Sequence, residues 1–457
     1  MSVADHTLDI EFAGPDSGAA PLTAPLTWGQ RAIWETIVRT APDDHYFNFG
    51  HVLKVPGPRR TVAEASTALA ALVERHGALR TRLSEPGLPG EVLPDKAGGE
   101  PYQRLAERGR LPVVITDDDP DRVLDELAAR PFDYVGEWPL RVALVLDGDR
   151  VTHVVLVFCH LAADGFGAEI ALRDLRMLLL RGDRGGGAIR RPGALQPLDL
   201  ARWQAGPEGR KAAETAAAHW EREFRRIPPT MFSAPTGSAA DPPIWRALLR
   251  SPALELAVRS IAHVRRASTS TVLLTAVAAL VGRFTGHETC AMLPISANRV
   301  RRGTADIVTT MSQEGLFTLD LDLGGAGGAS FTDLLRAAGP AALRAYRSAY
   351  HDPADRNRVT TTIDLERGES IRPYCCFNDM RFADPGPVAC DPDEITTALA
   401  RTSLSWPMSQ EKLNCRFCVH LTVDGVSLTA DTRYLSRPDI ERFLLELESF
   451  LVGAAVR

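Results

Sequence analysis

The first part of the chain carries hydrophobic residues first at helical and then at strand spacing. Residues 26–39 place Leu, Ile, Trp and Val at roughly helical intervals, and Thr27 can cap the start of this helix. Residues 62–76 predict a long amphipathic helix that is closed by Gly77 as its C-terminal cap. Strand-like sequence follows over 78–83. The pattern therefore predicts a mixed α/β structure.

The clearest predicted element is a β-hairpin. One strand covers 140–146, the turn is Asp147-Gly148-Asp149, and the return strand covers 151–158. The return strand is almost entirely apolar, so we expect it to lie inside a sheet. A glycine-containing loop then leads into a helix over 168–180. This order displays the loop residues at the end of a buried strand.

A stretch rich in Gly, Arg and Pro, residues 182–193, has no apolar periodicity and is typical of a linker. We place the domain boundary there, between an N-terminal lobe over 26–181 and a C-terminal lobe over 194–457. Residues 1–25 form a loose lead-in, without the cationic start and apolar block of a secretory signal. In the second half the pattern predicts a helix over 212–224, a pair of helices over 254–284 and a helix over 438–451 that is capped by Ser436. It predicts strands over 245–249, 416–422 and 427–435.

Length and composition fit a soluble protein of two domains. A chain of 457 residues suits two cores of about 200 residues each. The hydrophobic content of 45% and the charged content of 24% are those of a globular protein. The net charge of -6, without a basic stripe lined by aromatic residues, argues against a nucleic-acid partner. No stretch reaches the roughly 18 apolar residues of a membrane span, which argues against an integral membrane protein. Because the start of the chain does not resemble a secretory signal, we expect a cytoplasmic protein, and we expect a monomer.

The cysteines predict neither disulfides nor a metal site. Seven cysteines are an odd number for a disulfide framework. Cys415 and Cys418 form a CxxC, but on the predicted strand the two thiols point to opposite faces, and no second CxxC completes a zinc site. We expect buried, reduced thiols and no bound metal.

The run CHLAADG at 159–165 carries the candidate chemistry. A general base needs a neutral imidazole that is held rigidly near the proton it removes, and His160 at a strand end is suited to this task. Asp164 can organise the loop if a cation pairs with it. Pairing across the hairpin turn places Arg141 near Leu156, which predicts a salt bridge between Arg141 and Asp164. The residues alone leave a second interpretation open, in which His160 is a hydrogen-bonded core histidine and Asp164 is unrelated to it.

Motifs along nearly the whole chain resemble, in order, those of the nonribosomal-peptide condensation superfamily. The run at 159–165 resembles its HHxxxDG signature. The other matching motifs are Leu26-Thr27 with residues 30–34, RHGALRT at 75–81, Pro131-Phe132-Asp133, Pro139-Leu140-Arg141, His219-Trp220, the buried helix at 275–286 and the turn at Asn298-Arg299. Seven matches in order make chance agreement a poor explanation.

The resemblance implies an α/β fold of two chloramphenicol-acetyltransferase-like lobes in a V with a central tunnel. In the family, donor and acceptor reach the second His of the signature from opposite faces, each on a phosphopantetheine arm, and that position is His160. The resemblance gives Asp164 a structural role, Arg141 the role of its salt-bridge partner, and Gly165 a backbone position beside the reacting thioester.

Two departures from the family pattern affect the expected site. Cys159 stands where the family has its first His, and strand alternation points it away from His160, so we expect a change of packing in a residue that supports the site. The family's usual GxFVN motif does not follow the turn at Asn298. We expect Asn298 and Asn378 to be substrate-binding residues. Asn378 lies where the family's chain crosses between lobes, and backbone capping is the alternative role for its side chain.

The resulting prediction is a free-standing condensation enzyme of natural-product biosynthesis. It would join a carrier-bound acyl or aminoacyl thioester to an amine or hydroxyl, as an amide or an ester, with His160 as the base. The sequence GGAGGAS at 324–330 weakly resembles a carrier's serine loop, but we expect a surface loop. The thioester would then arrive in trans, on the phosphopantetheine arm of a peptidyl or acyl carrier protein, to meet a small-molecule or carrier-bound nucleophile without any bound cofactor.

Two other functions remain open at this stage. The first is a non-catalytic, condensation-like scaffold that docks carrier proteins or recruits another enzyme, which the replacement at Cys159 favours and the intact His160, Asp164 and Gly165 oppose. The second is an acyltransferase that takes soluble coenzyme A thioesters.

Overall fold

The chain forms two compact units in the computed structural model, which describes residues 6–14, 22–84, 101–181, 195–235, 237–322, 329–381, 384, 386–412 and 416–456. The first unit comprises Met1–Lys211 and Ala297–Ser312, and the second comprises Ala212–Ser296 and Gln313–Arg457. This division differs from the predicted one, because residues 195–211 and a returning segment, 297–312, both belong to the first unit. The predicted linker at 182–193 lies outside the described residues, as does most of the loop at 324–330.

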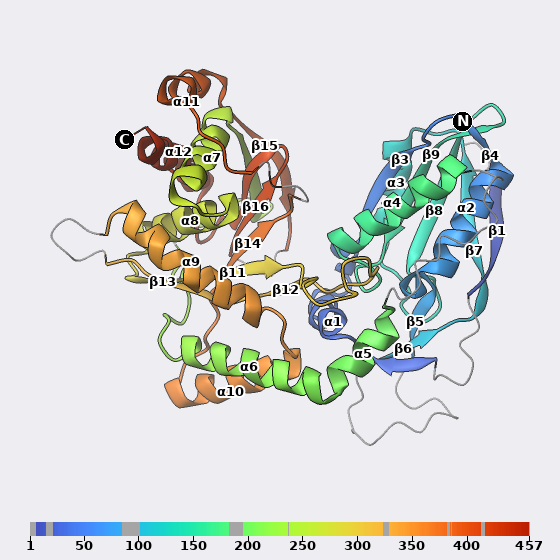
Figure 1. The fold of residues 1–457 in the computed structure, drawn as a ribbon, viewed down its shortest axis with the longest axis horizontal. Helices are drawn as coiled ribbons and strands as arrows, with labels where there is room; N and C mark the ends of the chain where they lie inside the picture. The colour runs from blue at the N-terminus through green and yellow to red at the C-terminus, as the bar shows by residue number, and fades with distance from the viewer. Residues whose placement is uncertain are drawn as a thin grey trace. The chain divides into compact units, whose positions relative to one another are not determined.

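The first unit is built on a six-stranded sheet with the order β1-β7-β8-β9-β3, in which β4 also pairs with β9 (Figure 1). Strands β7 and β8 are parallel, and the other neighbours are antiparallel. A small second sheet has the order β2-β6-β5. The strands are β1 (His6–Ala13), β2 (Thr23–Pro25), β3 (Phe49–Lys54), β4 (Arg60–Thr61), β5 (Thr81–Ser84), β6 (Tyr102–Leu105), β7 (Arg108–Thr116), β8 (Leu140–Asp147) and β9 (Arg150–Phe158).

Helices cover both faces of the large sheet. Successive residues of β9 alternate between the two faces, as a pleated strand requires. Leu156 and Phe158 pack in one core with helices α2 (Val62–Arg75) and α4 (Gly165–Arg181). Val155 packs with Val123 of α3 (Pro120–Ala128) on the opposite face. The nearly continuous apolar run of β9 thus arises because both of its faces are buried, which confirms the predicted position inside a sheet.

Local signals explain where the helices of this unit begin and end. Helix α1 (Trp28–Thr40) starts with a capping box, in which the Thr27 hydroxyl accepts from the Gln30 amide and the Gln30 side chain accepts from the Thr27 amide. The predicted cap at Gly77 is wrong. Helix α2 ends at Arg75 with His76 extended, and Gly77 starts a 3-10 turn, because its amide donates to the Gln196 side chain over 2.8 Å.

The second unit contains an eight-stranded sheet with the order β12-β11-β14-β16-β17-β10-β15, and β13 also pairs with β11. Its strands are β10 (Ile244–Arg250), β11 (Thr289–Ser296), β12 (Gln313–Glu314), β13 (Phe317–Asp320), β14 (Cys375–Asp379), β15 (Ser403–Gln410), β16 (Phe417–Thr422) and β17 (Gly425–Asp431). The remaining helices of the chain are α5 (Pro197–Ala205), α6 (Pro207–Phe224), α7 (Pro252–Arg265), α8 (Thr269–Thr285), α9 (Phe331–Ser348), α10 (Pro353–Arg367), α11 (Pro392–Ala398) and α12 (Arg437–Ala455).

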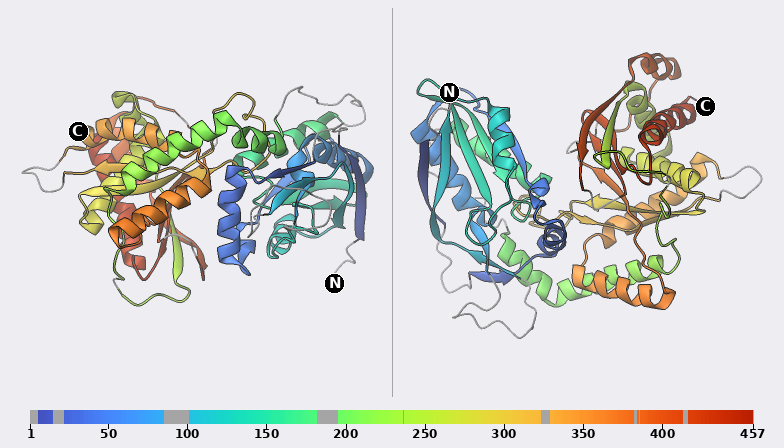
Figure 2. Two further views of the ribbon diagram at one scale, coloured as in Figure 1. Left: turned by 90° about the horizontal axis from the view of Figure 1, so that it is seen from below. Right: turned by 180° about the vertical axis from the view of Figure 1, so that it is seen from behind.

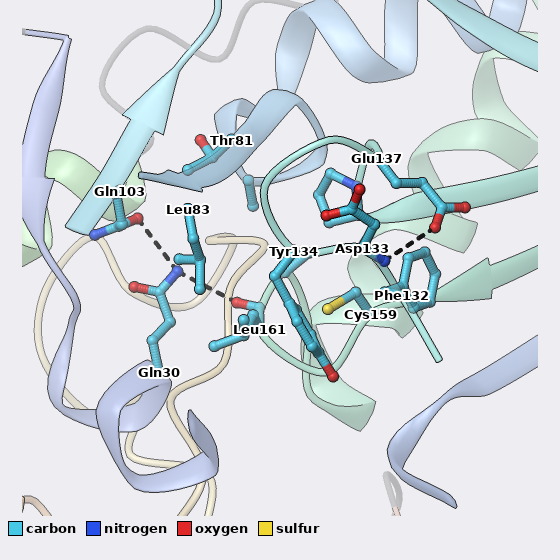
Figure 3. Close-up of a pocket in the computed structure, with 13 residues that line it drawn as sticks. Gln30, Thr81, Leu83, Gln103, Phe132, Asp133, Tyr134, Glu137, Cys159 and Leu161 are labelled. Atoms are coloured by element: carbon cyan, nitrogen blue, oxygen red, sulfur yellow. Dashed lines mark hydrogen bonds between the residues drawn. The ribbon is translucent and has the colours of Figure 1, made fainter. Parts of the chain in front are cut away.

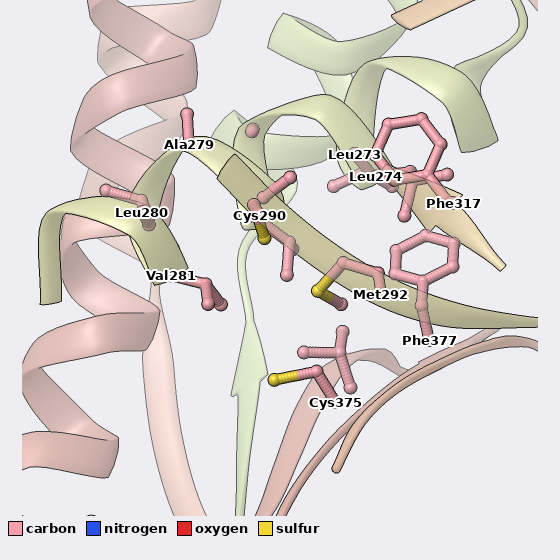
Figure 4. Packing of buried hydrophobic residues seen from close by; sticks show 14 of the residues in the cluster. Leu273, Leu274, Ala279, Leu280, Val281, Cys290, Met292, Phe317, Cys375 and Phe377 are labelled. Carbon is pink, nitrogen blue, oxygen red and sulfur yellow. The ribbon is translucent and has the colours of Figure 1, made fainter. Parts of the chain in front are cut away.

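One face of this second sheet is covered by helices α7, α8 and α12, which lie side by side in Figures 1 and 2. Leu273, Leu274 and Ala279 of α8 pack against sheet residues such as Met292 and Phe377 in a continuous apolar core (Figure 4). Because α8 is buried on most of its surface, its sequence is apolar all round.

Two further findings concern chemistry and membranes. Each described cysteine is a free thiol, whereas Cys415 lies outside the described residues, so the CxxC geometry stays a prediction.

Within the described ranges, no single helix is long and apolar enough to cross a membrane. One bent pair, α7 and α8 at 108°, meets the length and composition criterion.

Candidate active site

His160 lies in the tight turn that follows β9. The strand ends at Phe158, and the amide of Ala162 donates to the Cys159 carbonyl over 2.9 Å, which reverses the chain at once. The imidazole packs edge-on against Phe49 of β3, with 5.4 Å between ring centroids. Its Nδ1 lies 3.4 Å from the hydroxyl oxygen of Thr310, a residue of the returning segment. Contacts from two distant parts of the first unit therefore fix the ring.

The protonation state of His160 follows from these surroundings. Burial lowers its pKa below the ordinary value of 6.5. Hydrogen bonding to the backbone at His160 and then the negative charge of Asp164 oppose this shift without reversing it. The Thr310 hydroxyl donates its proton to the His160 carbonyl, so its oxygen is left to accept from Nδ1–H. The imidazole is therefore neutral at neutral pH with its proton on Nδ1, which leaves the Nε2 lone pair available as a base.

Asp164 organises the loop beneath His160. Its carboxylate accepts from the Gly167 amide over 2.8 Å and so caps the start of α4. It also accepts from the amides of Met311 and Ser312 and from the Ser312 hydroxyl, over 2.8 to 3.0 Å. Arg299 adds a bidentate pair at 2.7 and 2.9 Å. Burial alone would raise the pKa of Asp164, but the Arg299 charge and these hydrogen bonds hold it below 3.8, so the group is ionised.

Residues 297–312, which return to the first unit, lie close to the signature loop, residues 159–165. Two glycines make this close approach possible. A Cβ on Gly29 of α1 would lie 2.3 Å from the Thr310 carbonyl oxygen and 2.8 Å from the Met311 Cα. A Cβ on Gly167 of α4 would lie 3.0 Å from the Thr309 carbonyl oxygen. The segment that supplies Thr310 and Ser312 is thus packed against α1 and α4 at backbone distance.

The predicted salt bridge between Arg141 and Asp164 is wrong. The Arg141 guanidinium pairs with Glu137, at 2.7 Å from Nε and 3.0 Å from Nη2. Its other N–H groups donate to three carbonyls, those of Leu127, Arg130 and Pro131, over 2.7 to 2.8 Å. The cation that pairs with Asp164 is Arg299.

Strand register explains the error. Arg141 lies directly opposite Val157 in the ladder of β8 and β9, because a register irregularity between Val145 and Leu146 shifts the pairing beyond the turn. Directly opposed residues share a face, and Val157 lies on the side of the sheet away from α4. Asp164 starts α4 on the other side, so Arg141 holds the 127–137 loop instead of the signature loop.

Cys159 points away from His160, as the alternation predicted. It belongs to a separate apolar cluster with Val157, Phe132 and Leu161, and it borders a cavity of about 20 Å³ (Figure 3). Tyr134 and Glu137 also line this cavity. Burial raises the pKa of the Cys159 thiol to about 12, so the thiol stays protonated and is a poor nucleophile.

The other predicted site residues are placed as follows. Gly165 is exposed at the first position of α4, next to Asp164. Asn298 is buried in a left-handed conformation (φ 55°), and its side-chain amide donates to the Met311 carbonyl, so it supports the returning segment. Asn378 is half-buried on β14 of the second unit. Substrate contacts of Asn298 and Asn378 stay predictions.

Sequence reasoning missed the roles of Arg299, Thr310, Ser312 and Gly29. The motif at Asn298-Arg299 was a usable signal, since it identified the turn that carries the Asp164 partner. Thr310 and Ser312 had no such signal, because the residues that they contact in the signature loop lie about 150 positions earlier in the sequence. Among the described residues, no group of three or more His, Cys, Asp or Glu side chains is arranged to hold a metal.

Comparison with known proteins identifies the family. Residues 22–373 match the model of the condensation domain. Over 325 residues the chain is 30% identical to phosphinothricin tripeptide synthetase PhsC of Streptomyces viridochromogenes, an alignment that covers 68% of this chain and 28% of that protein. The chain thus spans little more than a quarter of this relative's length.

Solved structures show the same fold at low sequence identity. The X-domain in complex with OxyB from teicoplanin biosynthesis aligns with a TM-score of 0.70 at 16% identity, over 97% of this chain and 96% of that one. The condensation domain of the monacolin K polyketide synthase MokA aligns with a TM-score of 0.70 at 16% identity, over 96% and 99% of the two chains. Together with the family match over most of the sequence, these likenesses establish that the chain belongs to the condensation-domain family and has its chloramphenicol-acetyltransferase-like fold.

Proposed function

We propose that this chain catalyses condensation between a carrier-bound acyl or aminoacyl thioester and an amine or hydroxyl, in natural-product biosynthesis. The observation that carries the proposal is the neutral imidazole of His160, fixed at a strand end by Thr310 with its Nε2 lone pair available. A group of this kind can take a proton from a nucleophile as the nucleophile attacks.

The chemistry balances without any further reagent. The nucleophile's nitrogen or oxygen attacks the thioester carbonyl carbon, and its proton passes to Nε2 of His160. The carbon–sulfur bond then breaks, and the leaving thiolate takes the proton back to give a free thiol and an amide or ester. The negative charge of Asp164 stabilises the imidazolium that forms in between.

The partner and substrate form are part of the same proposal. Family membership supports a carrier protein that presents the acyl group on its phosphopantetheine arm. Binding energy from the arm, remote from the reacting bond, would align the thioester carbon near His160 and raise turnover. We therefore expect carrier-bound acyl groups to react faster at saturation than the same groups on coenzyme A or on a short thiol.

His160→Ala tests the proposal, with His153→Ala as a matched control on β9, the strand that precedes His160. His153 is half-buried, and its ring nitrogen Nδ1 lies 3.1 Å from the hydroxyl oxygen of the adjacent Thr152. We expect His160→Ala to fold normally and to lower amide or ester formation at least about 100-fold, because a positioned general base is lost. We expect His153→Ala to keep normal turnover. Product formation and thiol release from each thioester form would be measured in parallel, with circular dichroism as the check on folding.

One observation favours a second candidate, a non-catalytic docking scaffold. The first histidine of the signature is Cys159 here, and the same fold occurs in an X-domain that was solved in complex with OxyB. A folded His160→Ala protein with unchanged product formation would favour this candidate over the enzyme. Equal rates with all three thioester forms would instead favour an acyltransferase for soluble thioesters.

A further inference from the structure

One edge of the first unit's large sheet begins beside His160. Among the described strands, β3 pairs only with β9 and is therefore the outermost strand on this side of the sheet (Figure 1). Its first residue, Phe49, lies opposite Phe158, the last residue of β9. The Phe49 ring also contacts the imidazole of His160. A chain that lies along the outer side of β3 would thus lead to the proposed base.

The hydrogen bonds of the ladder show which backbone groups of β3 face outward. The amide of Val55 donates to the Thr152 carbonyl over 2.8 Å, one position beyond the end of the strand. In an antiparallel ladder, hydrogen-bonded and non-bonded pairs alternate, and the register here is regular, so every second residue back from Val55 bonds to β9. The residues whose N–H and C=O groups point instead to the free edge are Gly50, Val52 and Lys54.

The outward groups nearest to His160 are open. No hydrogen bond in the described part of the chain reaches the N–H or C=O group of Gly50 or Val52. Both residues are partly accessible to solvent. The edge therefore offers main-chain donors and acceptors to a ligand within one to three residues of Phe49.

This part of the edge also lacks the protection that exposed edges usually carry. Free strand edges recruit other strands, so proteins commonly guard them with charged residues or proline. At the opposite edge of the same sheet, β1 carries Asp9 and Glu11. In β3 the only charged residue is Lys54, at the end away from His160. An unguarded edge beside a proposed base is suited to binding the substrate.

We propose that this edge binds the pantetheine arm of the thioester substrate through main-chain hydrogen bonds to Gly50 and Val52. The inference rests on the proposed condensation function and adds a binding site to it. The arm is a flexible chain with two amide groups, and an extended chain with amides can pair with a strand edge as an added strand does. Its sulfur carries the thioester. An arm that lies along β3 with its sulfur toward Phe49 would present the carbonyl carbon to His160.

The spacing of the amides fits this assignment. The rise of a strand places Gly50 about 3 Å and Val52 about 10 Å behind Phe49. Standard bond lengths place the two amide nitrogens of an extended arm about 4 and 9 Å from its sulfur. Both amides therefore lie alongside Gly50 to Val52 when the sulfur is level with Phe49. Because the contacts are to main-chain groups and to the arm, they do not depend on the acyl group.

Two probes that cannot react distinguish the arm from other chains with amides. S-methylpantetheine has the arm and no acyl group, whereas N-acetyl-alanyl-alanine methylamide has peptide amides and no arm. Amide hydrogen exchange would be followed by NMR in the full chain, labelled with ¹⁵N-valine and ¹⁵N-leucine. Val52 and Leu53 form an internal pair, since their N–H groups point to opposite sides of β3.

We expect the Val52 amide to exchange fast in the free chain and the Leu53 amide to exchange slowly. Saturating S-methylpantetheine should slow the exchange of Val52 at least about tenfold and leave Leu53 unchanged, and the dipeptide should change neither. Slow exchange of Val52 in the free chain would overturn the proposal, because the edge would already be covered. Absence of protection by S-methylpantetheine, or equal protection by the dipeptide, would also overturn it. Protection that grows with protein concentration would assign the edge to a second copy of the chain instead.

A proline substitution tests the outward N–H group itself. Val52→Pro removes this donor but no bond to β9, and edge strands accept proline where the N–H faces outward. We expect it to weaken S-methylpantetheine binding about three- to tenfold, because one hydrogen bond is lost. Thr7→Pro is the matched control, since the bond from the Gly14 amide to the Glu107 carbonyl and the register of β1 place the Thr7 N–H on the opposite free edge. Equal loss in both variants would contradict the site, and the exchange measurement on the unmodified chain provides the test if Val52→Pro does not fold.

A kinetic experiment then links the edge to the reaction. For one acyl group, we expect the pantetheine thioester to have a lower KM than the propyl thioester, which has no amide, and Val52→Pro to remove that preference. If His160→Ala leaves product formation unchanged, the condensation proposal fails while the exchange result still stands or falls by itself. If turnover depends on His160 but S-methylpantetheine protects no edge amide, only the inference about β3 is refuted.

Discussion

Arg299→Ala removes the counter-charge of a carboxylate that has almost no contact with solvent. The side chains of Arg299 and Asp164 are 8% and 2% exposed, and two N–H groups bind two carboxylate oxygens. Removing one partner of such a buried pair costs about 3 to 5 kcal/mol, because the other charge is left without compensation. We expect Arg299→Ala to destabilise the first unit by that amount.

The assay has to report on this site, since a chain of two compact units need not unfold in a single step. The amides of Gly167, Met311 and Ser312 donate to Asp164 and supply local probes. Their hydrogen–deuterium exchange should accelerate by roughly two to three orders of magnitude in Arg299→Ala, up to the limit of complete local opening.

Double-mutant cycles separate the observed pairing from the one that the sequence suggested. For Arg299→Ala with Asp164→Ala we expect a coupling energy of about 2 to 3 kcal/mol, because the double variant leaves no unpaired charge. For Arg141→Ala with Asp164→Ala we expect additivity within about 0.5 kcal/mol, because Arg141 contacts Glu137 and loop carbonyls instead. A large coupling for Arg141 with little for Arg299 would refute the assignment of Arg299.

Two further predictions concern His160 and the segment that holds it. Because burial lowers the pKa of His160, its titration by ¹³C-histidine NMR should have a midpoint below 6.5. The value of kcat/KM should fall only as the pH drops through that midpoint. A midpoint above 6.5 would contradict the assignment of His160 as a neutral base. Gly29→Ala should destabilise the protein by about 1 to 3 kcal/mol in thermal unfolding, because its methyl group overlaps the Thr310 and Met311 backbone. The control Gly339→Ala on α9 meets no atom within 4 Å and should be neutral or stabilising, so equal losses would contradict this packing.

Local signals in the sequence were sufficient for the elements that present His160. The hairpin of β8 and β9 and the following helix α4 lie where apolar alternation and glycine predicted them. The same holds for the caps at Thr27 and Ser436, whose side chains accept from backbone amides three residues on. These features depend on neighbours within a few positions, so periodicity and capping chemistry determine them.

The partner of Asp164 could not be predicted in this way. Choosing between Arg141 and Arg299 required the register of β8 against β9, and one residue of difference moves a side chain to the other face of the sheet. It also required knowing that 297–312 returns to the first unit, a contact between positions 135 residues apart. Family resemblance identified the Asn298-Arg299 turn without giving its function.

The position of Cys159 bears on whether replacement of the first signature histidine would prevent His160 from acting as a base. Phe158 and Cys159 leave β9 toward opposite faces, so Cys159 packs with Val157 and Phe132 while His160 packs with Phe49 and Thr310. The Cys159 thiol is protonated because burial raises its pKa to about 12. A side chain in this place cannot relay a proton to His160. It acts through packing, on the face of the sheet where Arg141 holds the 127–137 loop, so the replacement is compatible with an intact base at His160.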